Sequence, residues 1–145
     1  MDRYDLTGTW SLLSYRLLGS RGRVRHPYGE DPAGYLLYMP DGFMAVSIMA
    51  GRRGLWAGTD IRRQTEREAA EATRTYLSYS GTYEVLPDRV VHSIQVSLFP
   101  NWTGTRQERF YRLTDGCLEL STSPLDAERH EPRAHLVWRR GAPAR

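Results

Sequence analysis

The chain has 145 residues, of which 40% are hydrophobic and 26% charged, as in one ordinary globular domain. Its net charge of +3 comes from scattered arginines without basic stripes or stacking aromatics, so we expect no nucleic-acid partner. No apolar run reaches the ~18 residues of a membrane helix, and one cysteine excludes an internal disulfide. Because the opening MDRYDLTGTW has no secretory signal, we expect a cytoplasmic protein with no membrane partner.

Polar and apolar residues alternate through the first half of the chain, and this period is typical of β-strands. The alternation predicts strands over residues 9–17, 35–39 and 43–49, with Pro40-Asp41-Gly42 as a tight turn between the last two. One helix is predicted over about residues 65–80. It begins at a capping box of Thr65 and Glu68, and Gly81 is expected to end it.

The second half of the chain predicts five further strands, at residues 82–86, 89–98, 105–113, 117–122 and 133–140. Pro87-Asp88 and Asp115-Gly116 are the turns of two hairpins. Residues 141–145 are predicted to be a flexible tail. We therefore expect a single domain, 1–145, with a core over about residues 5–140.

The connections between these eight strands are of two kinds. If the strands alternate in direction, the three tight turns fall at one end and all four long connections fall at the other. This arrangement predicts an all-β fold, an eight-stranded antiparallel up-and-down barrel with one helix and a cavity that opens among the long loops. A flattened β-sandwich is the alternative. The helix could either cover the opening or pack on the outer wall.

His92 is the first candidate for a functional residue. It lies in the strand over 89–98 and shares its predicted inner face with Ile94 and Val96, which are candidate ligand-binding residues. A histidine there could transfer protons in the cavity, or it could be a hydrogen-bonded core residue. Since none of the other histidines pairs with His92 at ligand spacing, no metal site is expected.

Glu108 and several tyrosines are further candidates. Glu108 could be a buried acid with a raised pKa, or one member of an exposed ion pair. Tyr83 could donate a hydrogen bond to a substrate carbonyl, and Tyr35 and Tyr38 could line the cavity. The alternative for these tyrosines is simple packing within the barrel.

Three more candidates are placed near the open end. If the first strand alternates from an inward Trp10, Arg16 also points inward and could hold a carboxylate or enolate; alternatively it extends out through the mouth. Phe99 and Trp102 flank the short loop at the mouth, where an aromatic ring can cover or anchor a ligand.

Gly8-Thr9-Trp10 resembles the G-x-W signature of lipocalins, in which the tryptophan closes one barrel end and an arginine near the last strand's end stacks on it. Arg139 and Arg140 end the last predicted strand here. Together with the stretches HPYGEDPAGYLLYMPDGFM, YLSYSGTYEV and VSLFPNWTGTRQER, this signature makes the chain similar to the bacterial lipocalin-like domain family. The resemblance implies a lipocalin-like barrel that binds a hydrophobic small molecule. Some lipocalin-like proteins of natural-product pathways are cyclases.

The chain contains no phosphate-binding glycine loop, no nucleophile elbow and no Cys–His pair, so we expect neither a cofactor nor covalent catalysis. The resemblance then favours a cofactor-independent cyclase or isomerase of polyketide or other secondary metabolism, forming for example a spiroketal. His92, Glu108 and Tyr83 would be its acid–base groups. One alternative is a non-catalytic carrier or sensor of a hydrophobic ligand. Another is a homodimer whose barrels are filled by side chains.

Overall fold

A computed structural model of the protein describes residues 2–123 and 133–141. Two helices are present, α1 (Arg3–Leu6) and α2 (Glu66–Arg74), with short 3₁₀ turns at Ser20–Gly22 and Pro100–Trp102. The strands are β1 (Gly8–Leu18), β2 (Val24–Arg25), β3 (Ala33–Tyr38), β4 (Phe43–Met49), β5 (Tyr76–Val85), β6 (Arg89–Ser97), β7 (Arg106–Thr114), β8 (Cys117–Ser121) and β9 (Arg133–Arg140). Most of the predicted tail lies outside the described residues.

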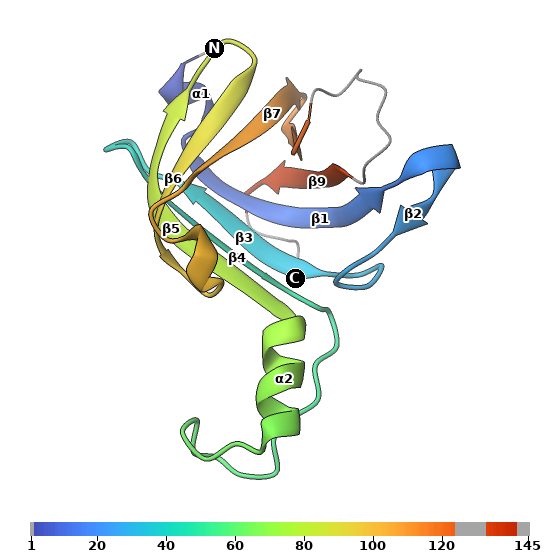
Figure 1. Ribbon diagram of the computed structural model, residues 1–145. Coiled ribbons are helices and arrows are strands. Elements are labelled where there is room, and N and C mark those ends of the chain that lie inside the picture. The colour runs from blue at the N-terminus through green and yellow to red at the C-terminus, as the bar shows by residue number, and fades with distance from the viewer. Residues whose placement is uncertain (1, 124–132, 142–145) are drawn as a thin grey trace.

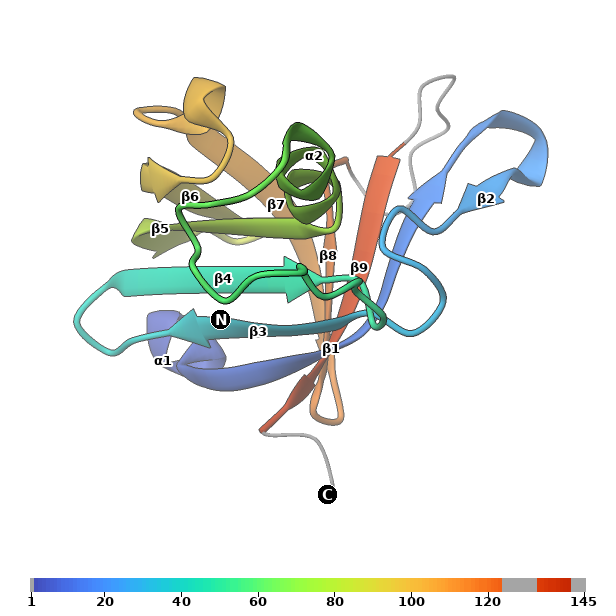
Figure 2. The ribbon, with the colours of Figure 1, turned by 90° about the horizontal axis from the view of Figure 1, so that it is seen from below.

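The strands form one closed antiparallel barrel (Figure 1). Neighbours pair in chain order from β3 to β9, and β1 pairs with both β3 and β9, which closes the sheet (Figure 2). The two-residue β2 only extends the end of β1, so eight strands make the closed wall. The predicted up-and-down barrel is confirmed, and closure removes the exposed edges that a flattened sandwich would keep.

Trp10 and Arg140 close the end of the barrel that carries the tight turns. The buried Trp10 donates its indole N–H to the Leu6 carbonyl at 2.9 Å. The Arg140 guanidinium lies 4.2 Å from the centre of the Trp10 ring, and it donates to the carbonyls of Thr7 (3.0 Å) and Asp5 (2.7 Å). Helix α1 is thereby held across this end, as expected for the G-x-W pattern.

Helix α2 begins at the predicted capping box of Thr65 and Glu68 but ends at Arg74, six residues before residue 80. From Tyr76 onward the chain is β5, which pairs with β4 and turns Tyr79 into the barrel. Gly81 lies inside this strand rather than at the end of a helix. A Cβ atom there would overlap the Ser93 carbonyl oxygen, so glycine permits the close approach of β6.

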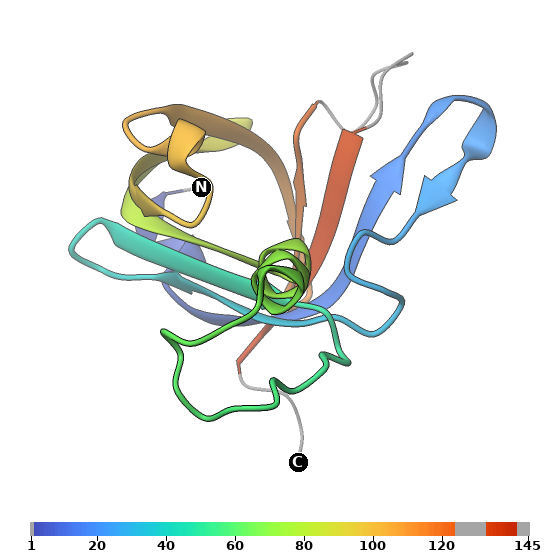
Figure 3. The same cartoon turned by 60° about the horizontal axis from the view of Figure 1, so that its bottom comes forward.

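Helix α2 neither packs on the outer wall nor plugs the barrel. It projects from the rim at the start of β5, and the loop over residues 50–64 runs beside it (Figures 1 and 3). None of its nine residues is buried. Within the described part of the chain, no helix is long and apolar enough to cross a membrane.

Two β-bulges change which side chains face the interior. On β1 the register with β9 shifts between Leu12 and Ser14, so one extra residue is inserted and Tyr15 lies on the inner face beyond it. On β6 the pairing with β5 skips Gln95, and Val96 beyond the skip is exposed. Strict alternation along either strand would place these side chains on the opposite faces.

Candidate functional site: a cavity inside the barrel

A cavity of about 120 Å³ lies inside the barrel, in the half nearer the long connections. Its wall is mainly apolar and aromatic, and is made by Leu36, Val46, Ile48, Leu77, Leu120, Ala134, Leu136, Tyr15, Trp102 and Trp138. The polar groups that the described wall residues carry include the hydroxyls of Tyr15, Tyr79 and Thr122, the imidazole of His92 and the guanidinium of Arg109. An apolar hollow with a few convergent polar groups is the usual form of a small-molecule site.

His92 lies at the centre of a buried chain of three polar side chains from three strands. Its Nε2 is 2.6 Å from the Tyr38 hydroxyl oxygen, and its Nδ1 is 2.7 Å from the Tyr79 hydroxyl oxygen. Burial lowers the pKa of His92 to about 3, and the charge of Arg109 adds to this effect. Burial also raises the pKa of both tyrosines. All three groups are therefore neutral near pH 7.

A neutral imidazole carries one N–H, so one tyrosine must donate to His92 and the other must accept from it. Tyr38 is fully buried and does not line the cavity, and His92 is its only side-chain hydrogen-bond partner among the described residues. Every hydrogen is used if Tyr38 donates to Nε2 and the Nδ1–H donates to Tyr79. The hydroxyl hydrogen of Tyr79 is then free to donate into the cavity that Tyr79 lines.

Arg109 gives the cavity a positive charge that the sequence reasoning missed. It lies on the inner face of β7, lines the cavity and donates to the Glu108 carbonyl at 2.9 Å. Of the wall residues that the structure describes, none is acidic. The alternation of β7 placed Arg109 on one face with Tyr111 and Leu113, which was the one available signal that this face points inward.

Five of the predicted site residues do lie inside the barrel: His92, Tyr38, Tyr83, Ile94 and Trp102. His92 and Trp102 line the cavity, and the Trp102 ring packs edge-on against Tyr79 at 5.9 Å. Tyr83 lies nearer the closed end, where its hydroxyl donates to the Met39 carbonyl at 2.8 Å. The functional roles of all five stay predictions.

Arg16 and Glu108 do not reach the cavity. The bulge at Leu13 turns Arg16 to the outer wall, where it donates to Nδ1 of His135 at 3.0 Å. Glu108 is exposed on the outer face of β7 and forms an ion pair with Arg89 at 3.2 Å. The alternative for Glu108, an exposed ion pair, is therefore the correct one.

Tyr35, Val96 and Phe99 are also outside the cavity. Tyr35 is 45% exposed, because its neighbours Leu36 and Tyr38 occupy the inner face of β3. Val96 is 67% exposed because of the skipped residue on β6. Phe99 is exposed, and the centre of its ring lies 5.4 Å from the centre of the Trp102 ring.

A second, larger hollow of about 720 Å³ lies outside the barrel, between α2 and the loop over 50–64. It is open to solvent, and two of its apolar lining residues, Leu55 and Ile61, are 98% and 78% exposed. Such a hollow cannot exclude water from a ligand, so the barrel cavity is the better site. In the described ranges, no group of three His, Cys, Asp or Glu side chains could hold a metal ion.

The closed barrel, its Trp10–Arg140 end and its interior cavity define a small-molecule-binding β-barrel. The chain belongs to the lipocalin-like domain family, whose model matches residues 7–141. It is also similar to the 4'-hydroxy-3'-methoxypropiophenone carrier protein ppsC of Aspergillus oryzae (strain ATCC 42149 / RIB 40). The two are 37% identical over 107 residues, which cover 67% of this chain and 96% of the relative. The protein is therefore a lipocalin-like ligand binder.

Proposed function

We propose that the protein is a non-catalytic carrier of a small aromatic metabolite. The observation that carries this proposal is the cavity, whose volume is about 120 Å³. A cavity of roughly 150 Å³ holds one benzene molecule in a protein core. The cavity is thus of the order of one aromatic ring. A substituted ring would fill it with the ring itself and extend its substituents toward the long connections, whereas a fatty acid or a polyketide of several rings would exceed it much further.

The wall fits such a ring chemically as well as by size. The rings of Tyr15, Trp102 and Trp138 offer edge and face contacts, each worth about 0.5–1.5 kcal/mol beyond the area buried. Tyr79 has a hydroxyl hydrogen to give to an oxygen acceptor such as a ketone. The name of the related fungal carrier describes a one-ring ketone with hydroxy and methoxy groups. We extend that ligand class to this chain.

The positions of the candidate acid–base groups favour a carrier over the cyclase that the family resemblance suggests. Both nitrogens of His92 are occupied by tyrosines, and a pKa of about 3 makes the imidazole a weak base near neutrality. Glu108 is on the outer wall, and the Tyr83 hydroxyl is bound to a backbone carbonyl. The acid–base groups expected for ring closure are thus not assembled around the cavity.

A fluorescence titration tests this proposal. Because Trp102 and Trp138 line the cavity, 4'-hydroxy-3'-methoxypropiophenone should change the tryptophan emission with saturation at one ligand per chain. The compound should be recovered chemically unchanged after long incubation with the protein, as checked by mass spectrometry. A long-chain fatty acid serves as the size control and should not bind. Conversion of the compound, or failure of every one-ring aromatic ketone to bind, would contradict the proposal.

A further inference from the structure

The surroundings of Arg109 differ from those of its neighbours on β7. Three charged neighbours on the outer face have partners of opposite charge: Arg106 with Glu84, Glu108 with Arg89, and Arg112 with Glu119. Arg109 points inward and forms no ion pair with any residue in the ranges 2–123 and 133–141. Its one hydrogen bond there goes to a neutral backbone carbonyl. A half-buried guanidinium without a counter-ion is a site for an anion.

The other titratable groups around Arg109 do not neutralise its charge. The titratable side chains around it are Tyr15 from β1, Tyr38 from β3, Tyr79 from β5 and His92 from β6, and all are neutral near pH 7. The wall residues of β4, β8 and β9 that the structure describes carry no charge. Burial raises the pKa of the three tyrosines and the charge of Arg109 opposes this, whereas for His92 burial and the charge of Arg109 both lower the pKa.

We propose that the cavity selects the ionised form of its ligand, so that an aromatic ring with an acidic phenol binds as the phenolate. The phenolate oxygen accepts the hydroxyl hydrogen of Tyr79 and faces the guanidinium of Arg109, and the phenol proton is released to solvent. An acyl group conjugated with the ring makes a phenol acidic enough to ionise near neutral pH. This inference rests on the proposed carrier function and specifies which ligands the carrier prefers.

A matched pair of ligands separates this inference from the carrier proposal. 4'-Hydroxypropiophenone can ionise, whereas its methyl ether, 4'-methoxypropiophenone, cannot. Between about pH 6 and pH 9, affinity for the phenol should rise up to about tenfold per pH unit until the phenol is ionised, while affinity for the ether stays constant. Equal pH profiles would overturn the inference and leave the carrier proposal standing. If neither compound binds, both fail.

Two variants assign the effect to Arg109. Arg109→Met should abolish the pH dependence and weaken phenol binding at high pH about tenfold or more, while the ether still binds. Arg106→Met, on the outer face of the same strand, should bind both ligands as the wild type does. An Arg109→Met protein that keeps the pH dependence would overturn the inference.

A spectroscopic measurement can be made on the wild-type protein alone, so it does not depend on whether a variant folds. Ionisation shifts the ultraviolet absorption of an acylphenol to longer wavelength, so the bound form can be identified directly. At a pH below the ligand's own pKa, the bound 4'-hydroxypropiophenone should show the phenolate band. A bound ligand with the neutral phenol spectrum would overturn the inference.

Discussion

The Nδ1 atom of His92 lies 2.7 Å from the hydroxyl oxygen of Tyr79, and this contact joins two buried polar side chains in the cavity wall. His92 is 1% exposed, and its other nitrogen is occupied by Tyr38. If Tyr38 donates to Nε2, the Nδ1–H donates to Tyr79, and we propose that His92 then orients Tyr79 as a hydrogen-bond donor to the ligand. This is a role in positioning a binding group, which agrees with a carrier.

Removing the Tyr79 hydroxyl should weaken ligand binding. In Tyr79→Phe the ligand oxygen loses its hydrogen-bond donor, and we expect the dissociation constant for 4'-hydroxypropiophenone to rise about fivefold to tenfold. Tyr83→Phe is the matched control, because the Tyr83 hydroxyl is bound to the Met39 carbonyl away from the cavity. Equal affinities in the two variants would mean that Tyr79 gives no hydrogen bond to the ligand.

His92 should make the stability of the protein depend on pH. Its pKa is about 3 in the folded protein and 6.5 in an unperturbed histidine, so only the unfolded chain gains this proton as the pH falls below 6.5. The contribution of the neutral histidine is full above pH 6.5. It declines down to about pH 3, by up to ~1.4 kcal/mol per pH unit.

Urea denaturation at several pH values measures this effect. Other groups contribute to the pH dependence of stability as well, so the wild type must be compared with His92→Gln, which keeps a donor and an acceptor but has no titrating group. The free energy of unfolding should fall more steeply with decreasing pH in the wild type than in His92→Gln. Parallel pH profiles would show that His92 does not have the lowered pKa.

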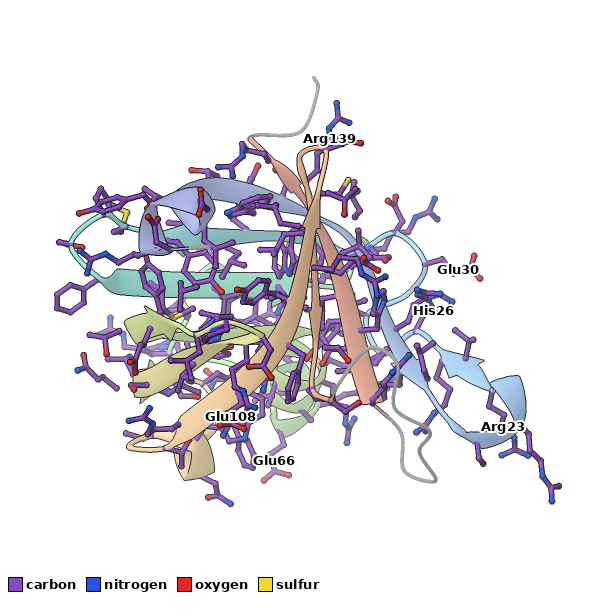
Figure 4. The ribbon with its side chains drawn as sticks, turned by 90° about the horizontal axis from the view of Figure 1, so that it is seen from above. Arg23, His26, Glu30, Glu66, Glu108 and Arg139 are labelled. Carbon is purple, nitrogen blue, oxygen red and sulfur yellow. The ribbon has the colours of Figure 1, made fainter. Side chains whose placement is uncertain are left out.

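Arg140 should contribute more to stability than its neighbour Arg139. Arg140→Met loses the contact with the Trp10 ring and two hydrogen bonds to backbone carbonyls, for an expected loss of about 1–3 kcal/mol in the free energy of unfolding. Arg139 is exposed and points away from the barrel (Figure 4), so Arg139→Met should change stability by less than ~0.5 kcal/mol. Equal losses would contradict the role of Arg140 at the closed end.

The fold could be predicted because its signals are local. Alternation and turn residues indicated the eight barrel strands. Trp10, with Arg139 and Arg140 as candidate partners, indicated the closed end, and the structure shows that Arg140 is the partner. His92 was correctly placed inside, because the pairing of β6 with β5 keeps a regular register from Val90 to Ile94 before it shifts. The helix was predicted too long because Tyr76 and Leu77 fit helical spacing as well as strand spacing. Pairing with β4 decides between the two.

The cavity residues were harder to predict because they depend on pairing between distant strands. Leu13 and Gln95 are the extra residues at the two bulges. No local sequence pattern indicates these bulges, so Arg16 and Val96, which lie beyond them, were assigned to the wrong face of their strands. On β7 both faces carry charged residues, Glu108 on one and Arg109 on the other. The apolar side chains of Tyr111 and Leu113 beside Arg109 were the one signal that its face points inward.

Filling the cavity tests the central claim most directly. Ala134 lines the cavity on β9, and Ala134→Phe would place a ring in the ~120 Å³ where we locate the ligand. Val137→Phe, on the outer face of the same strand, is the control. We predict that Ala134→Phe stays folded in thermal unfolding but binds one-ring aromatic ketones at least tenfold more weakly than Val137→Phe does. Unchanged affinity in a folded Ala134→Phe protein would place the ligand elsewhere, for example in the open hollow beside α2, and would contradict the account.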